Sequence, residues 1–228
     1  MSGILYEVAR PIVAALLHLV CRYRINNRPS ALPEGPIIVA SNHLCWIDIP
    51  LIGVAFPGRV SFMAKEEYAR SWFHRWIIRL FGSFTVERGT IDRSALKAAE
   101  QALYRGYALG IFPEGTRSKS FQLIPAGPGT AYVALRNNAY ILPVGISGTE
   151  NIRQRYERKR FMYRPDVVIN IGEPFKLPGV DGKPSRQQLA SSTETIMRSL
   201  AELLPESYRG AYGDGASGSD ETANDDAN

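Results

Sequence analysis

Residues 37–48 read Ile37-Ile38-Val39-Ala40-Ser41-Asn42-His43-Leu44-Cys45-Trp46-Ile47-Asp48, and this stretch decides how the chain folds. The apolar run at its start is typical of a buried strand. The strand leads into His43, and Asp48 followed by Pro50 predicts the start of a helix, with an acidic capping residue and an early proline. Such a strand leaves the imidazole at the carboxyl edge of a sheet, where open α/β sheets bind their ligands.

The pair of His43 and Asp48 is the first candidate site. A separation of five positions, at about 100° per residue, would leave the side chains ~140° apart on one helix, whereas a turn can fold the carboxylate back onto the ring. A carboxylate on one ring nitrogen fixes the tautomer, so that the histidine can act as a general base. The alternative is that His43 ends a loop and Asp48 only caps a helix.

Metal chemistry and a nucleophilic serine are both disfavoured by the sequence. The chain has three histidines, and no further histidine or cysteine lies at ligand spacing near the pair, so we expect no metal and no cofactor. No Gly-x-Ser-x-Gly elbow supplies a nucleophilic serine. The hydroxyl that His43 would activate therefore belongs to a substrate.

The composition indicates one basic domain with an acidic end. A chain of 228 residues with 45% hydrophobic residues can bury one substantial core. Its cysteines, Cys21 and Cys45, form no disulfide framework, which favours a reducing compartment. The net charge is +5, but residues 205–228 carry −5, which leaves +10 for residues 1–204. Such a domain attracts an anionic partner, which is a nucleic acid, a membrane surface or a phosphorylated substrate.

Further strands and helices follow along the chain. Strands are expected at 60–64, 84–87, 108–112, 140–146 and 167–171. Helices are expected at 48–56, 67–82, 92–105, 128–138 and 185–203. Pro143 suggests an edge or an irregular position for its strand, because proline cannot donate to a ladder. The basic run 153–164 is interpreted as a solvated face, with a contact to anionic lipid or an acyl carrier as the alternative.

Residues 4–21 predict an amphipathic N-terminal helix. Its longest uncharged stretch, 11–21, is too short for a membrane span, which needs about 20 apolar residues. One stripe carries Leu5, Val8, Ile12, Leu16 and Leu19, and the opposite side carries Glu7, Arg10, His18 and Arg22. The helix either lies in a membrane interface or packs on the domain. Trp72 and Trp76, beside arginines in the helix at 67–82, leave the same two alternatives.

Four sequence blocks carry the strongest signal in the chain. They are Asn42-His43-x4-Asp48, Phe84-Thr85-Val86-Glu87-Arg88, Phe112-Pro113-Glu114-Gly115-Thr116-Arg117-Ser118 and Ile141-Leu142-Pro143-Val144. Their order and intervals resemble the four motifs of the glycerolipid acyltransferases, in particular the 1-acylglycerol-3-phosphate acyltransferases. The resemblance covers roughly residues 30–175. It departs mildly at Glu87, where the family often carries an aspartate.

The resemblance implies a catalytic pair and a set of phosphate ligands. His43 would deprotonate the free hydroxyl of a lysophospholipid, which attacks the thioester of acyl-CoA or acyl-carrier protein. Asp48 would hold the imidazole ring during this step. The substrate phosphate would be bound by Lys65, Arg88 and Arg117, because fixed cations at strand ends suit an anionic headgroup.

The resemblance also implies an acceptor pocket and a donor region. The acceptor pocket would contain Asn42, Glu114, Gly115 and Thr116, with a structural ion pair as the alternative for Glu114. Backbone amides near Gly115 or Asn42 are candidates to stabilise the oxyanion. Pro143 would lie in the acyl-donor region, with a purely structural role as the alternative.

The fold implied is a single αβα domain of the α/β class, with a mixed, mostly parallel sheet flanked by helices. We expect an anchoring helix within residues 1–28, the acyltransferase domain at 29–204, and a disordered acidic tail at 205–228. The helix would attach the protein, as a peripheral or monotopic protein, to an anionic membrane surface on the cytoplasmic face.

The function implied is the conversion of lysophosphatidate to phosphatidate in phospholipid biosynthesis, without nucleic acid as a partner. One alternative is another lysolipid acceptor, such as an ornithine-type lipid. The others are a hydrolase that uses water in place of the lipid hydroxyl, and a basic lipid- or nucleic-acid-binding module without turnover. The module would explain the charge but gives no reason for His43, Asp48 and Glu114 near strand ends.

Overall fold

The computed structural model describes residues 3–65, 84–86, 93–152, 163–180 and 182–213. Its strands are β1 (Arg22–Asn26), β2 (Ile37–Ser41), β3 (Val60–Lys65), β4 (Phe84–Val86), β5 (Ala108–Ile111), β6 (Tyr140–Ser147), β7 (Asp166–Ile171) and β8 (Phe175–Lys176). Its helices are α1 (Gly3–Val20), α2 (Asp48–Ala55), α4 (Arg93–Tyr104), α5 (Gly129–Arg136), α7 (Arg186–Glu202), α8 (Glu206–Arg209) and the 3₁₀ helix η2 (Gly210–Tyr212).

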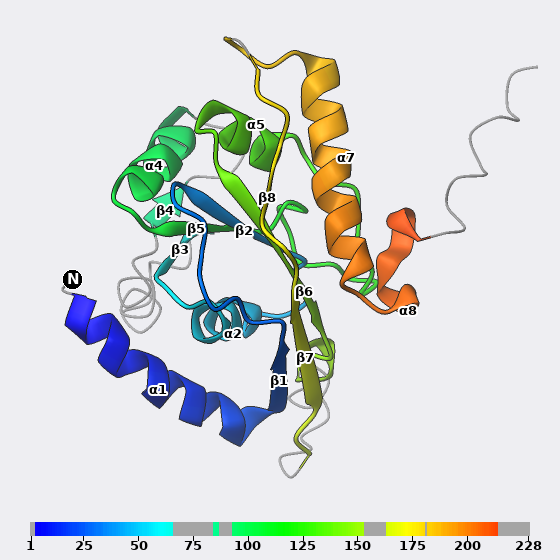
Figure 1. Cartoon of the computed structure of the whole chain (residues 1–228). Helices are drawn as coiled ribbons and strands as arrows, with labels where there is room; N and C mark the ends of the chain where they lie inside the picture. Colours follow the sequence, from blue (N-terminus) through cyan, green and yellow to red (C-terminus); the bar gives the residue numbers. More distant parts are fainter. Residues whose placement is uncertain (1–2, 66–83, 87–92, 153–162, 181, 214–228) are drawn as a thin grey trace, which may run out of the picture.

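The strands of the described residues form one eight-stranded sheet in the order β1-β7-β6-β2-β5-β3-β4, with β8 also paired to β6. Neighbouring strands run parallel except at β6, which is antiparallel to β7 and β8. Figure 1 shows α1 and α2 on one side of the sheet and α4, α5 and α7 on the other. The prediction of an αβα domain with a mixed, mostly parallel sheet is confirmed.

The strand β2 is buried along its whole length, and its side chains alternate between two halves of the core. Ile37 and Val39 pack in the layer that includes α1 and α2. Ile38 and Ala40 pack in the layer that includes α4, α5 and α7. Full burial of a Val or Ile side chain contributes ~1.5–3 kcal/mol, and a shift of one residue would exchange the two faces. The apolar run therefore fixes where the strand ends and where His43 lies.

The strand β6 lies in the interior of the sheet, between β2 and β7, so the edge position suggested for Pro143 is wrong. The proline is accommodated because the antiparallel partner of β6 changes beside it. β8 pairs with Tyr140 and Ile141, whereas β7 begins its pairing at Val144. The carbonyl of Pro143 accepts the N–H of Gly172 at 2.9 Å, between these two partners. Pro143 thus occupies the irregular position that was the other alternative.

Two segments differ from the predicted boundaries. The segment 1–28, assigned to an anchoring helix, also contains β1, which pairs in parallel with β7. This strand was missed although Arg22, Arg24 and Asn26 are exposed and alternate with the half-buried Tyr23 and Ile25, which is the period of two residues typical of a strand. At the other end, residues 205–213 are folded as α8 and η2, although a disordered tail was predicted from 205.

The other predicted elements are found close to their expected bounds. The helices expected at 48–56, 92–105, 128–138 and 185–203 correspond to α2, α4, α5 and α7. The helix expected at 67–82 with its two tryptophans, Arg88, and most of the basic run 153–164 lie outside the described residues.

Candidate active site

The candidate site lies where β2 and β5 end at the same edge of the sheet. These strands are neighbours and run parallel, so the residues that follow them emerge side by side. His43 follows β2 and Glu114 follows β5. The backbone N–H of His43 donates to Oε1 of Glu114 at 3.2 Å, and the N–H of Ser118 donates to the carbonyl of His43 at 2.9 Å. Two of the four sequence blocks are therefore in direct contact.

The side chains of His43 and Asp48 are paired at the centre of the site. Nδ1 of His43 lies 2.9 Å from Oδ2 of Asp48, and the same oxygen accepts the N–H groups of Leu44 at 2.7 Å and Cys45 at 2.8 Å. The carboxylate is fully buried and the imidazole is 14% exposed. In the tautomer that the carboxylate selects, Nδ1 donates, and Nε2 is the nitrogen left to accept a proton.

The carboxylate of Asp48 does not cap the helix α2 as predicted. Asp48 is the first residue of that helix, and the N-cap position, Ile47, makes no side-chain hydrogen bond. The carboxylate turns back because the N–H groups of Leu44 and Cys45 in the preceding turn point to it. The turn therefore brings acid and ring together, whereas a shared helix would have kept them apart.

A phenylalanine that the sequence analysis did not assign to the site holds the other side of the imidazole. The ring of Phe112 stacks on that of His43, with centroids 3.9 Å apart and an angle of 14° between the planes. Asp48 thus fixes the edge of the imidazole while Phe112 fixes its face. The signal available in the sequence was the place of Phe112 at the end of the strand expected at 108–112, directly before Pro113.

Glu114 is buried and bonded to two backbone segments. Its Oε1 accepts the N–H of His43, and its Oε2 accepts the N–H of Ile124 at 3.3 Å. Burial raises the pKa of Glu114 to about 7, and the two N–H groups offset only part of this shift. The ion pair considered as the alternative for Glu114 is not found among the described residues. Its contacts are hydrogen bonds to the backbone, which tie the turn of His43 to the segment around Ile124.

Asn42 and Gly115 have structural roles in the turns where they lie. The Asn42 side chain is buried and exchanges two 2.8 Å hydrogen bonds with the backbone of Ile146, so it ties the turn to β6. The N–H of Gly115 donates to the carbonyl of Phe112 at 2.9 Å, which removes it as an oxyanion donor. Gly115 adopts φ +66°, a conformation that favours glycine, and it lies with Thr116 on the exposed part of that turn.

Two of the three predicted phosphate ligands, Arg117 and Lys65, lie within the described residues. Arg117 is exposed in the turn after β5, and its charge lowers the pKa of the Cys45 thiol, although burial of that thiol has the larger, raising effect. Arg117 is therefore close to the turn of His43. Lys65 ends β3, whose carboxyl end lies on the same edge of the sheet, next to β5. Arg88 lies outside the described residues.

The remaining groups near the site indicate no further catalytic partner among the described residues. Cys45 is buried in the core, and burial raises the pKa of its thiol, so the thiol is neutral. In the described part of the chain, no group of at least three His, Cys, Asp or Glu residues is arranged to hold a metal ion. Pro143 is buried inside β6, opposite Ala40 of β2.

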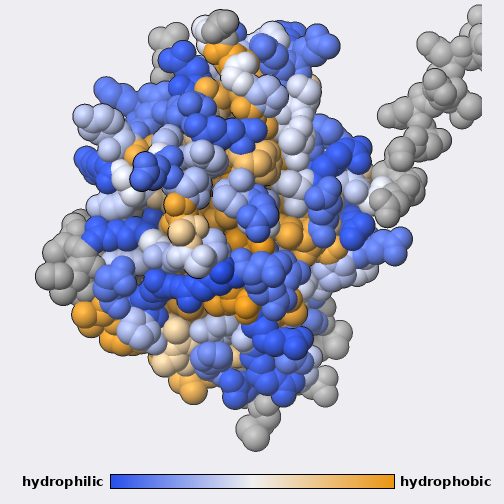
Figure 2. All heavy atoms as spheres, viewed as in Figure 1, coloured by the Kyte–Doolittle hydropathy of each residue, from blue (hydrophilic) through white to orange (hydrophobic). Residues whose placement is uncertain are grey.

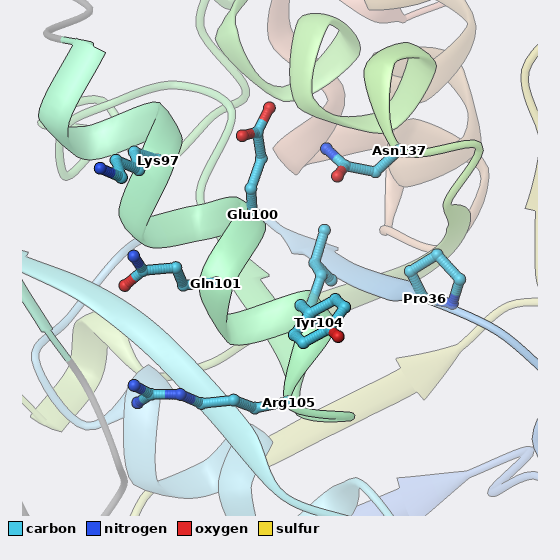
Figure 3. Close-up of a pocket in the computed structure, with 8 residues that line it drawn as sticks. Pro36, Lys97, Glu100, Gln101, Tyr104, Arg105 and Asn137 are labelled. Atoms are coloured by element: carbon cyan, nitrogen blue, oxygen red, sulfur yellow. The ribbon is translucent and has the colours of Figure 1, made fainter.

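An open groove of about 730 Å³ lies on the opposite edge of the sheet from His43. It is lined by Pro36, which precedes β2, by the last turns of α4, and by Asn137 after α5. Figure 3 shows Glu100 directed toward Asn137, with Tyr104 beside Pro36. The groove lies at the amino ends of the parallel strands, whereas the candidate site lies at their carboxyl ends. The two are therefore separate.

Fold and site together define an α/β protein with a buried His–Asp pair at a strand end, an arrangement suited to general-base catalysis on a substrate hydroxyl. The chain belongs to the acyltransferase family, whose family model matches residues 22–147. It is therefore an acyltransferase, as the sequence analysis predicted.

Two relatives are similar to this chain in sequence, and one solved structure is similar to it in fold. A 1-acyl-sn-glycerol-3-phosphate acyltransferase of Bacillus subtilis is 24% identical, over 87% of this chain and 96% of its own length. A lyso-ornithine lipid O-acyltransferase of Brucella abortus is 33% identical, over 75% of this chain and 73% of its own length. The crystal structure of the LPA acyltransferase PlsC from Thermotoga maritima has the same fold, with a TM-score of 0.66 and 23% identity, covering 87% of this chain and 79% of that one.

Proposed function

We propose that this enzyme transfers a fatty acyl group from acyl-CoA or acyl-carrier protein to the free hydroxyl of lysophosphatidate, which yields phosphatidate for phospholipid biosynthesis. The single observation that carries the proposal is the imidazole of His43, held by Asp48 through Nδ1 at 2.9 Å. The name of the Bacillus subtilis relative supports lysophosphatidate as the acceptor.

The reaction follows from the orientation of the imidazole. Nε2 of His43 takes the proton of the acceptor hydroxyl as its oxygen attacks the thioester carbonyl. The tetrahedral intermediate then breaks its carbon–sulfur bond, and the proton passes from Nε2 to the departing thiolate. Asp48 stabilises the imidazolium formed between these steps. Positioned proton transfer of this kind contributes ~10²–10⁴-fold to the rate.

The headgroup of the acceptor would be bound by cations at the same edge of the sheet. Arg117 and Lys65 are the described candidates. Arg117 follows β5 close to the turn of His43, and Lys65 is the last residue of β3, which ends at the same edge of the sheet. Arg88 is proposed from the sequence alone. A guanidinium suits a phosphate because it offers paired donors in a fixed geometry.

A second acceptor class is favoured by a specific observation. The Brucella abortus relative, which is more identical to this chain than the Bacillus subtilis relative, is named a lyso-ornithine lipid O-acyltransferase. A lyso-ornithine lipid carries a free hydroxyl but no phosphate. The two acceptors would therefore react at His43 in the same way. They differ in the headgroup that the proposed cations would bind.

We further propose that α1 lies in a membrane interface. Its outer face exposes Val8, Ile12, Leu16 and Leu19, each more than half exposed, and these are members of the stripe predicted from the sequence. Figure 2 shows hydrophobic residues along the lower left of the molecule, where α1 lies in Figure 1. None of the helices in the described ranges has the length and apolar character to cross a bilayer.

The inner face of α1 packs on the domain through other residues. Leu17 is buried, the Tyr6 hydroxyl donates to the carbonyl of Gly53 at 3.2 Å, and Arg10, which was predicted on the polar side, donates to the carbonyl of Val54 at 3.1 Å. These residues hold α1 to α2, and the exposed apolar stripe takes no part in that contact. A stripe left exposed along a fixed helix suits an acyl-chain boundary.

A product assay with a panel of acceptors tests the proposal. Purified protein is mixed with labelled acyl-CoA or acyl-carrier protein and, in separate vesicles, lysophosphatidate, a lyso-ornithine lipid or another lysophospholipid. Phosphatidate as the main product supports the proposed acceptor, and acylated ornithine lipid supports the second. Free fatty acid alone would indicate a hydrolase, and binding without any product would contradict acyl transfer.

A further inference from the structure

The C-terminal residues 205–213, which we call the C-terminal clasp, pack against the loop 118–128 that follows the Glu114 turn. The N–H of Leu123 donates to the carbonyl of Tyr208 at 2.8 Å, and Nε2 of Gln122 donates to the carbonyl of Ser207 at 3.2 Å. Around these bonds lies a separate apolar cluster. Its members are Leu123, Met197, Leu200, Ala201 and Leu204, with Ala126, Tyr208 and Tyr212 packed against them.

The loop 118–128 holds both backbone groups of His43. At its start, the N–H of Ser118 donates to the carbonyl of His43 at 2.9 Å. Further along, the N–H of Ile124 donates to Oε2 of Glu114, whose Oε1 accepts the N–H of His43. The loop therefore binds the carbonyl of His43 directly and the amide of His43 through Glu114. Any movement of this loop changes the position of the backbone that carries the imidazole.

The clasp is fixed on its other side to the end of β6. The Tyr208 hydroxyl donates to Oε1 of Glu150 at 2.7 Å, across 58 residues of sequence. Burial, and then the neighbouring carboxylate of Glu150, raise the pKa of Tyr208, so its hydroxyl stays protonated and remains a donor. Glu150 follows β6, the strand whose Ile146 is bonded to Asn42. One tyrosine therefore links the loop to the strand on the other side of the His43 turn.

The contact between clasp and loop is too close for any side chain at Gly210. A Cβ at this position would lie 2.3 Å from the carbonyl oxygen of Leu123, and φ of Gly210 is +50°. Both facts require glycine here. The neighbour that would have to move is the backbone of the loop, one residue before Ile124.

We propose that the C-terminal clasp is a positioning device for His43, acting through the loop 118–128 and Glu114 and anchored by Tyr208 on Glu150. This inference rests on the proposed acyl transfer, because it assigns a role in that reaction to residues outside the four sequence blocks. The clasp does not touch the reacting atoms. It determines the rate of the chemical step because small displacements of a general base reduce proton transfer strongly.

Two variants of the full chain test the proposal. Gly210→Ala pushes the clasp away from Leu123, and Tyr208→Phe removes only the bond to Glu150. We expect Gly210→Ala to lower kcat by at least about tenfold, with the KM for the acyl donor within about twofold of wild type. Tyr208→Phe changes kcat in the same direction by less, since the backbone bond of Tyr208 to Leu123 remains.

Ser185→Ala is the matched control. It removes the capping box at the start of α7, at the other end of that helix from the clasp, and so lowers stability without touching the clasp. We expect it to leave kcat per folded molecule unchanged. If kcat of Gly210→Ala follows the folded fraction as it does in this control, the clasp is only structural and the proposal is wrong.

Amide hydrogen exchange separates failure of the clasp from failure of the proposed function. The N–H groups of Ser118, Ile124 and His43 should exchange faster in Gly210→Ala and Tyr208→Phe than in Ser185→Ala, whatever the substrate is. Unchanged exchange at these amides overturns the proposal, and so does faster exchange without a loss of kcat. Absence of acyl transfer in the wild type would instead contradict the proposed function.

Discussion

Oδ2 of Asp48 lies 2.9 Å from Nδ1 of His43 while it accepts two backbone N–H groups, those of Leu44 and Cys45. One buried oxygen thus organises the turn and orients the ring at the same time. The other carboxylate oxygen, Oδ1, has no hydrogen-bond partner within the described residues. The acid is therefore positioned by the backbone and is available to hold the imidazole.

Asp48→Asn should lower kcat strongly while the protein stays folded. The amide oxygen can still accept the two N–H groups, but the carboxylate that selects the tautomer and stabilises the imidazolium is lost. In comparable catalytic pairs this costs about 10⁴-fold in kcat. The measurement is the initial rate of acyl transfer, with Tm as the check on folding.

If Asp48→Asn retains a kcat within tenfold of wild type, the carboxylate is not needed to orient the base.

His43→Ala is the companion variant. It should abolish acyl transfer and leave vesicle binding intact.

Glu114→Gln should change how stability depends on pH. The folded-state pKa of Glu114 is raised to about 7 from its ordinary 4.5, so the native state holds the proton that the unfolded chain releases above pH 4.5. Stability is therefore lost as pH rises from about 4.5 to about 7, by an amount on the order of 3 kcal/mol. The glutamine variant lacks this loss.

Urea denaturation of wild type and Glu114→Gln at about pH 5 and about pH 8 measures the effect. We expect the free energy of unfolding of the wild type to fall by about 1–3 kcal/mol more than that of the variant over this interval. Parallel pH profiles would show that Glu114 is ionised in the fold at all these pH values.

The part of the fold that the sequence predicts well is the part with local signals. The apolar run from Ile37 and the turn before Asp48 gave the strand, the helix and the contact of His43 with its acid. The strand β1 was missed because it has only five residues, and its pairing with β7 spans 144 positions of sequence. So short an alternation of polar and apolar residues becomes a strand only where a partner strand is available.

The same distinction holds at the candidate site. The resemblance to the family implied an acceptor pocket for Asn42, whereas its bond to Ile146, 104 positions away, had no signal in the sequence. Phe112 stacks on His43 within the site, whereas Tyr208 bonds to Glu150 outside it, and neither contact has a signature in spacing. Motifs therefore indicate which residues gather at an edge, whereas the partner of each residue follows from packing.

Asn42→Ala should destabilise the protein markedly. It leaves the buried N–H and carbonyl of Ile146 without their partners, and each unpaired group costs about 1–3 kcal/mol. We expect a loss of about 3 kcal/mol or more in the free energy of unfolding, measured by urea denaturation. The control is Asn26→Ala, which breaks an exposed 2.8 Å bond to Asn170 and should cost less than about 1 kcal/mol. Equal losses in the two variants would contradict the anchoring role of Asn42.

The double substitution Ile12→Glu with Leu16→Glu should release the protein from vesicles that contain anionic lipid. Both side chains are exposed on α1, so the charges replace apolar surface without disturbing the packing of Tyr6 and Leu17. Burial of one such side chain contributes ~1.5–3 kcal/mol, so losing two is enough to abolish weak attachment. Substitution is preferable to deletion of residues 1–24, because the deletion would remove part of β1 from the sheet.

Cosedimentation with vesicles measures the binding, and Tm measures folding. The matched control is Gln187→Glu with Ser191→Glu, which adds the same charge to exposed positions of α7, one turn apart. The control should sediment as wild type does, whereas the α1 variant should remain in the supernatant with an unchanged Tm. If the α1 variant still sediments, another surface of the protein attaches it to the membrane, and release of both variants would show that the added charge alone is responsible.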